Sequence, residues 1–179
     1  HTAIHIVGGS ARKLLGPHIW QAGSSKGARY ARIDLTHHSR ISQEEMDLIE
    51  DHANSIINSN AKIEKTLLPR SEADLTYGFE LYQGGPPKFS EIRVVKIGDH
   101  DVQACGGTHH DHTGKIGEIR IIRTSQVQDG VERLQIVAGE TSREHARNQE
   151  RILQESSEVL GVSADDLPAA VRRFFQEWK

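Results

Sequence analysis

Two pairs of potential metal ligands stand out in the sequence, each with a spacing of four residues. His1 and His5 lie in a stretch with helical periodicity, where residues four apart project from the same face. Cys105 and His109 flank a glycine-rich turn whose backbone freedom lets the thiolate and the imidazole face one point. Three imidazoles and one thiolate suit zinc better than magnesium or calcium. The spacing therefore predicts one zinc ion bound by all four side chains.

The predicted zinc site has two open interpretations. The two pairs of ligands lie far apart in the sequence, so the site would tie the first helix to a late hairpin. Four protein ligands usually close a structural site, whereas catalytic zinc keeps a position for water or substrate. A catalytic role would need one displaceable ligand or a coordination number that rises to five during the reaction.

The pattern of apolar residues predicts an α+β fold with a mostly antiparallel sheet, and helices packed with it around the zinc site. Ser42 and Glu45 form a capping box that opens one of these helices. The predicted helices cover 1–15, 42–59 and 71–77. The predicted strands cover 18–23, 30–35, 63–68, 91–97, 102–104, 118–127 and 131–138. We expect these strands to form a single sheet.

The character of the chain changes after Gly139. Residues 140–160 are charged and helical without glycine or proline, and 164–179 predicts another helix that ends on three aromatic residues. We therefore divide the chain into a domain at 1–138 and a helical linker at 139–179, which leads toward a missing C-terminal domain. Because the sequence opens on His1 without methionine, we expect a fragment of a longer polypeptide.

Composition narrows the class of protein. Charged residues make up 26% of the chain and hydrophobic residues 36%, which is typical of a globular protein that does not enter a membrane. The net charge of −3 argues against extensive, sequence-independent binding of nucleic acid, although local contact with one end of an RNA stays open. A single cysteine excludes an intrachain disulfide, and with no visible signal peptide it favours a cytoplasmic location.

The two ligand pairs also carry a family resemblance. The segment His1-Thr-Ala-Ile-His5 resembles the HTATH element of alanyl-tRNA synthetase editing domains and of the free-standing AlaX deacylases. The segment from Cys105 to Gly117 resembles their CGGTHxxxTGxIG element. The order of the segments 15–23, 32–37 and 129–133 also fits, so the similarity spans about residues 1–140. A related domain of threonyl-tRNA synthetases shares the ligand spacing but fits the surrounding sequence less well.

This resemblance implies hydrolysis of the ester that joins a wrong amino acid to alanine tRNA. The wrong amino acid would be chiefly serine, with glycine as a second candidate, because an alanine pocket rejects neither strongly. The resemblance implies that Gln21 orients the substrate or water, although it also reads as a solvent-facing strand residue. Thr108 has two interpretations, a hydrogen-bond donor beside the metal and a cap of the turn.

The C-terminal segment bears on whether editing occurs in cis or in trans. Residues 161–168 resemble the segment that joins the synthetase editing domain to its C-terminal domain, and free-standing deacylases generally lack it. We therefore favour a piece of an archaeal-type synthetase, covalently continuous with missing domains and able to form a homodimer through the absent C-terminal domain. The alternatives are a free-standing trans-editing deacylase and a non-catalytic, zinc-stabilised tRNA-binding module.

Further basic and imidazole side chains have no assigned role at this point. His37 and His38 follow a predicted strand and are either supports of the zinc site or surface residues. His110 and His112 could compete with His109 for zinc, so the choice among them rests on spacing. A last group reads either as contacts to RNA phosphates or as a solvated sheet face, namely Lys88, Arg93, Lys96, Arg120 and Arg123.

Overall fold

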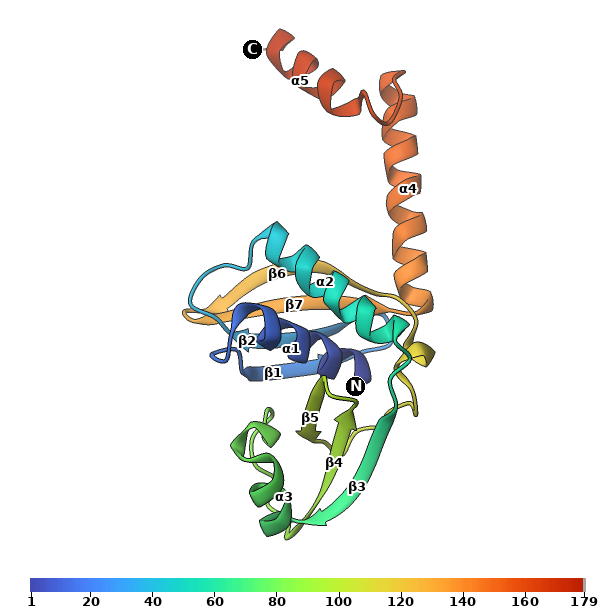
Figure 1. Ribbon diagram of the computed structural model, residues 1–179. Coiled ribbons are helices and arrows are strands. Elements are labelled where there is room, and N and C mark those ends of the chain that lie inside the picture. The colour runs from blue at the N-terminus through green and yellow to red at the C-terminus, as the bar shows by residue number, and fades with distance from the viewer. Residues whose placement is uncertain (179) are drawn as a thin grey trace. The chain divides into compact units, whose positions relative to one another are not determined.

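The structure is a computed structural model, and it describes residues 1–178. It confirms the α+β class with antiparallel strands (Figure 1). Its α-helices are α1 (Thr2–Leu15), α2 (Gln43–Asn58), α3 (Arg70–Tyr77), α4 (Glu140–Leu160) and α5 (Leu167–Glu177). Its strands are β1 (Gln21–Lys26), β2 (Ala31–Thr36), β3 (Ile63–Pro69), β4 (Glu91–Ile97), β5 (Asp101–Ala104), β6 (Ile119–Gln128) and β7 (Val131–Ala138). Two short 3-10 helices complete it, η1 (Phe79–Leu81) and η2 (Thr113–Ile116).

The chain forms two compact units, His1–Thr141 and a second one that begins at Ser142. The first unit contains all the strands, and the second contains nearly all of α4 together with α5. The division into a functional domain at 1–138 and a helical linker at 139–179 stays a prediction. No helix within residues 1–178 combines the length and the apolar character that crossing a membrane requires.

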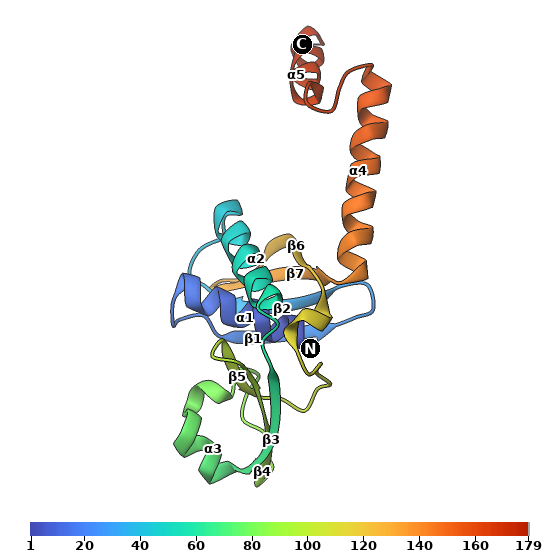
Figure 2. The same ribbon diagram turned by 45° about the vertical axis from the view of Figure 1, so that its right-hand side comes forward.

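The first unit contains two antiparallel sheets, so the expectation of a single sheet was wrong. One sheet has the order β1-β2-β7-β6 and the other the order β3-β4-β5 (Figures 1 and 2). Strand β2 pairs along its whole length with the distant β7, from Ala31 opposite Ile136 to Thr36 opposite Val131. Strand alternation in a sequence reveals hairpins but not such long-range partners, which explains the error.

Strand β4 is buried on both faces and so joins the two hydrophobic cores of the first unit. Val95 and Ile97 belong to the main core, beneath α1 and α2. Ile92 and Val94 point the other way and pack with α3 and η1 in a smaller core. Because alternate residues of a strand face opposite sides, one strand serves both cores and holds the two sheets together. Strand β5, which carries part of the candidate site, is hydrogen-bonded to this anchored strand.

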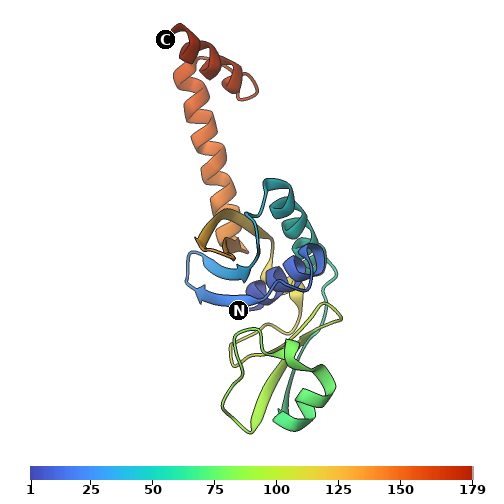
Figure 3. The same ribbon diagram turned by 90° about the vertical axis from the view of Figure 1, so that its left-hand side faces the viewer.

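Helices α1 and α2 lie side by side against one face of the four-stranded sheet (Figure 3). Helix α2 opens with the predicted capping box, in which Ser42 accepts from the Glu45 backbone N–H and the Glu45 carboxylate accepts from the Ser42 backbone N–H. Its Asn54 side chain exchanges two hydrogen bonds of 2.9 Å with the backbone of Ile119, at the edge strand β6. At Ile119 these bonds occupy the backbone groups that an edge strand would otherwise offer to another chain.

The segments 32–37 and 129–133, noted for their family resemblance, meet across the β2–β7 ladder. Asp34 and Arg133 face each other there, and the guanidinium donates two hydrogen bonds of 2.7 and 2.9 Å to the carboxylate. Such paired contacts combine charge with fixed geometry. The two segments therefore help to fix the register in which β2 pairs with β7.

Most element boundaries agree with the predictions to within one residue, but β1 and α5 each begin three residues later than predicted. Helix α1 begins at Thr2 with His1 as its N-cap, and β1 begins at Gln21 instead of residue 18. Helix α5 begins at Leu167, because residues 164–166 form a turn before it. The predicted end of that helix, Lys179, lies outside the described residues.

Two glycines with positive φ offer a matched test of backbone packing. A Cβ at Gly139 (φ 62°) would lie 2.8 Å from the carbonyl oxygen of Ile116, whereas a Cβ at Gly130 (φ 71°) would meet no atom within 4 Å. We expect Gly130→Ala to cost about 1–2 kcal/mol of unfolding free energy from its φ alone. Gly139→Ala should cost a further ~1–3 kcal/mol, because the backbone must shift.

The measurement for this pair is urea unfolding followed by the fluorescence of Trp20, with Trp178 replaced by phenylalanine in every sample. This signal reports the first unit. Equal losses for the two variants would contradict the close approach at Gly139 and leave only the cost of the positive φ.

Candidate metal centre

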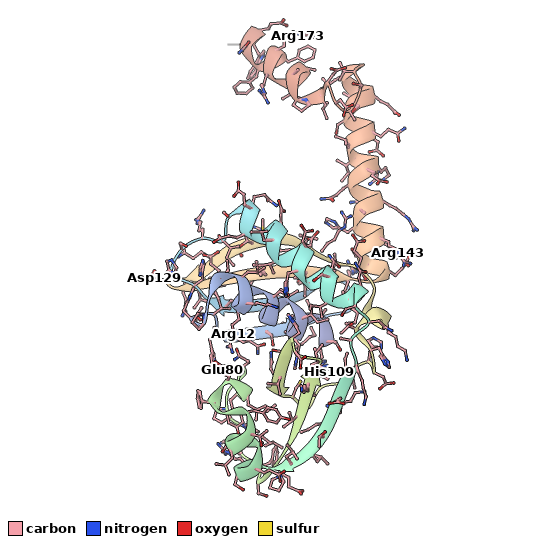
Figure 4. All side chains as sticks on the ribbon, in the orientation of Figure 1. Arg12, Glu80, His109, Asp129, Arg143 and Arg173 are labelled. Atoms are coloured by element: carbon pink, nitrogen blue, oxygen red, sulfur yellow. The ribbon has the colours of Figure 1, made fainter. Side chains whose placement is uncertain are left out.

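Three of the four predicted ligands meet at one point. His5 lies on the buried side of α1, Cys105 follows the last residue of β5, and His109 ends the loop after it. The ligand atoms of these three side chains all lie within 4.8 Å of one another. His109 Nε2 is 3.3 Å from Cys105 Sγ, and its labelled ring lies near the start of α1 in Figure 4. The fold thus gathers two imidazoles and a thiol from two segments, α1 and the loop after β5.

The two imidazoles are each held at the nitrogen that points away from the thiol. Asp101 Oδ2 lies 3.1 Å from Nδ1 of His5, and Thr2 Oγ1 lies 3.1 Å from Nδ1 of His109. Both rings therefore present Nε2 toward Cys105. A carboxylate or hydroxyl on the outer nitrogen is the usual support of a metal-binding histidine, because it fixes the tautomer and the ring orientation.

The loop between Cys105 and His109 is held by Arg93 of β4. Its guanidinium donates to the carbonyl oxygens of Cys105, at 3.1 Å, and of Gly107. The backbone N–H of Gly107 in turn points at Sγ of Cys105, at 3.4 Å. The sequence left two interpretations of Arg93 open, a contact to RNA phosphates and a residue on a solvated sheet face. Its half-buried position and its bonds to the loop fit neither. The side chain shapes the turn that carries the ligands.

Sequence reasoning missed Thr2, Arg93 and Asp101 as parts of the site. Asp101 gave little signal, because the predicted strand began only at residue 102. In the structure it is the first residue of β5 and stands four residues before Cys105, on the same side. Thr2 and Arg93 gave none, because their role depends on the packing of α1 and β4 against the loop.

The electrostatics of the cluster favour a thiolate. Burial raises the pKa of Cys105, but hydrogen bonds from His109, His5 and the Gly107 N–H outweigh it and lower the pKa to about 5. Burial lowers the pKa of His5, but Asp101 and Cys105 outweigh it and raise the pKa to about 9. A thiolate is therefore present at neutral pH, balanced by the His5 imidazolium. Two nitrogens and a thiolate fit zinc, which would take the place of the His5 proton.

His1 stands apart from this group of three. Its exposed ring lies over Gly107, where an added Cβ would come within 2.2 Å of the imidazole, and its centroid is 5.9 Å from that of His109. To complete a four-ligand site, His1 would have to turn its ring toward the cluster. His110 and His112 lie outside the group as well. The choice of His109 by spacing thus agrees with the geometry, whereas the zinc ion and its fourth ligand stay predictions.

Thr108 and Gln21 lie in different surroundings. Thr108 lines a cleft of about 410 Å³ together with His1, Thr2, His109 and His110. Of the three converging ligands, His109 lines this cleft. Gln21 instead lines a small separate cavity, which it shares with Gln83, Gln103 and Asp101. It thus lies on the Asp101 side of the cluster, away from Thr108.

Part of the chain matches a known protein family. Residues 92–135 match the family described as the threonyl and alanyl tRNA synthetase second additional domain. That segment contains β5, β6, Cys105 and His109, together with all of β4 but its first residue. This stretch of the chain is thus similar to a domain that threonyl- and alanyl-tRNA synthetases share.

The match to individual proteins is more specific. Over all 179 residues the chain is 50% identical to the alanine–tRNA ligase of Methanopyrus kandleri and 49% identical to that of Methanosarcina mazei. It is 46% identical to that of Thermococcus kodakarensis. The chain spans about one fifth of the length of these curated relatives. It therefore corresponds to a part of archaeal alanine–tRNA ligases, which confirms the resemblance noted in its motifs.

Asp101 is the residue that best tests the metal centre without removing a ligand. We expect Asp101→Ala to weaken zinc binding about 10–100-fold, because His5 loses the partner that fixes its ring. The measurement is a titration against a competing chelator at pH 7. Asp99→Ala is the matched control, since Asp99 is fully exposed on the turn before β5. Equal affinities for the two variants would remove Asp101 from the site.

The thiolate can be tested in the metal-free chain. Because the pKa of Cys105 is about 5, its alkylation by iodoacetamide should be nearly independent of pH from about 6 to 8 and should fall below pH 5. His5→Gln should move the midpoint upward, since it removes an imidazolium that stabilises the anion. Zinc should protect the thiol. An unchanged midpoint in His5→Gln would contradict the coupling between the two side chains.

Proposed function

We propose that this chain is the editing module of an alanine–tRNA ligase, which hydrolyses the ester of alanine tRNA mischarged with serine or glycine. The metal centre is the reaction site, with one zinc ion held by His5, Cys105 and His109 and completed by His1. The observation that carries this proposal is the convergence of three ligand atoms within 4.8 Å beside a cleft that can admit a tRNA end.

The position of His1 supports a catalytic role of the metal centre rather than a purely structural one. His5, Cys105 and His109 form the buried side of the site, whereas His1 is exposed and lies apart from them. Catalytic zinc typically has three firm protein ligands and a fourth position for water or substrate. A displaceable His1 would provide that position. Such a site would differ from a structural one, which four firm ligands close.

The chain's own residues would do the remaining work. Zinc, when bound, supplies a Lewis acid and lowers the pKa of water toward neutrality. The exposed Thr108 hydroxyl lies on the cleft and can donate a hydrogen bond to the ester carbonyl as negative charge develops there. Asp101 holds His5 in one orientation, and Gln21 would orient water in the cavity that it shares with Asp101. Gln21 is therefore a positioning residue.

The extent of the match supports editing in cis. The relatives align with the entire chain, including the helical segment after residue 139, and they are all alanine–tRNA ligases. A free-standing deacylase would not need that segment. We assign alanine tRNA as the substrate carrier for the same reason, with the missing synthetase domains, including the one proposed to form the homodimer, supplying most of its binding surface.

Single-turnover deacylation of alanine tRNA charged with serine tests this function. The zinc-loaded chain should cleave the ester, and Cys105→Ala should reduce hydrolysis to the spontaneous rate while circular dichroism shows an intact fold. Thr108→Val should slow hydrolysis about tenfold, because one hydrogen bond to a charged group contributes on the order of 1.4 kcal/mol. Gln21→His should lower activity without lowering the zinc content. Asp99→Ala should leave hydrolysis unchanged.

A different outcome would reassign the chain. If the zinc-loaded chain binds the tRNA but leaves the ester intact, the centre is structural and the chain is a zinc-stabilised tRNA-binding module. If Cys105→Ala loses zinc but keeps full activity, the metal does not take part in the reaction.

A further inference from the structure

A second cluster of imidazoles lies outside the metal centre described above. The ligand nitrogens of His18, His37 and His38 lie within 4.8 Å of one another. His18 belongs to the connection between α1 and β1, and the other two follow the last residue of β2. The backbone N–H of His37 donates to the carbonyl of Gly130, so the cluster lies beside the β6–β7 turn that the label Asp129 marks in Figure 4. His109 lies elsewhere in the same view.

The backbone that carries His18 and His37 is fixed by Thr36. Its hydroxyl donates to the carbonyl of His18 at 2.6 Å and accepts from the N–H of Trp20 at 2.8 Å. The Thr36 N–H in turn donates to the Trp20 carbonyl at 2.9 Å. Arg12 Nε donates to the Ile19 carbonyl at 3.0 Å, which ties the same connection to α1. The two histidines are thus built on paired, restrained segments, as a binding site requires.

The nitrogens of His18 and His37 are about as close as two ligands of one metal ion. Nε2 of His18 lies 2.9 Å from Nδ1 of His37, and the rings are tilted by only 18°. Two nitrogens on one tetrahedral zinc ion lie about 3.3 Å apart, since each bond is about 2.0–2.1 Å long. The opposite nitrogen of His18 lies against Gly16, where an added Cβ would come within 3.2 Å. His18 therefore turns Nε2 toward His37.

The third imidazole completes the set by a small movement. His38 is exposed, and its ring centroid is 4.7 Å from that of His37 and 5.3 Å from that of His18. Rotation of an exposed side chain costs little, so His38 can close on an ion held by the other two. His37 is only 5% exposed and provides the rigid member.

Two carboxylates lie near the imidazole cluster. Glu45 and Glu132 both interact electrostatically with the buried ring of His37. Glu132 is itself 2% exposed, so its charge is poorly screened. These two carboxylates would offset the charge of a divalent ion.

We propose that His18, His37 and His38 form a second binding site for a divalent transition-metal ion such as zinc, nickel or cobalt. Three imidazoles without a thiolate select borderline metals over magnesium and calcium, and they bind zinc more weakly than a site with a thiolate does. An ion there clamps the α1–β1 connection to the end of β2. The site is independent of the proposed editing reaction and would exist whether or not the chain hydrolyses an ester.

Metal counting in the 179-residue chain tests this second site. After removal of metal by a chelator, equilibrium dialysis against excess cobalt should give two bound ions for the unmodified chain. His18→Asn and His38→Asn should each give one, and both replace exposed side chains outside the hydrophobic cores. His110→Asn, which changes another exposed histidine, should keep both ions. Cys105→Ser should lose the thiolate-to-cobalt absorption band and keep the ion at the imidazole cluster.

Two outcomes would overturn the proposal. One is a count in His18→Asn and His38→Asn equal to that of the unmodified chain. The other is a Cys105→Ser chain that binds no cobalt at the concentration that fills the unmodified chain. Either result would leave the three histidines as a hydrogen-bonded surface cluster. The deacylation assay on His18→Asn, His38→Asn and Cys105→Ser separates this result from a failure of the editing function, because of these three variants only Cys105→Ser should affect hydrolysis.

Discussion

The contact between His5 of α1 and Asp101 of β5 is the interaction on which the candidate centre depends. It joins a helix of the main layer to a strand of the smaller sheet, and both side chains are largely withdrawn from water. A buried ionic hydrogen bond is favourable only when each partner is satisfied. Here the second nitrogen of His5 turns to the thiol of Cys105. The constraint thus fixes the orientation of the imidazole and the charge of the sulfur together.

The rest of the first unit can be understood as a means of holding this contact. Strand β4 is buried on both faces, so the smaller sheet cannot shift relative to α1 without exposing Val95 or Ile97. The same strand carries Arg93, which binds the carbonyl groups of the ligand loop. Packing, loop shape and ligand orientation therefore depend on one strand. Of the four proposed ligands, only His1 lies apart from the others. This position is consistent with a ligand that a substrate could displace.

The two imidazole clusters differ in how they are built, and the difference has chemical consequences. The cluster with Cys105 has a thiolate, one buried and two half-buried ligands, and a hydrogen-bond partner on each outer nitrogen. The cluster of His18, His37 and His38 has no sulfur and only one buried ring. The first arrangement therefore suits tight binding and chemistry at the ion, and the second suits a weaker ion that links two segments of backbone.

The sequence by itself determined most secondary-structure elements, the capping box at Ser42, the family resemblance and the choice of Cys105 and His109 as a pair. These features depend on residues close together in the chain or on specific motifs. Only the tertiary structure decided that there are two sheets, that β2 pairs with β7, and that Thr2, Arg93 and Asp101 support the ligands. Only the tertiary structure also shows that His18 contacts His37. Each of these contacts joins distant segments, and hydrophobic periodicity records which face of a segment is buried but not which partner covers it.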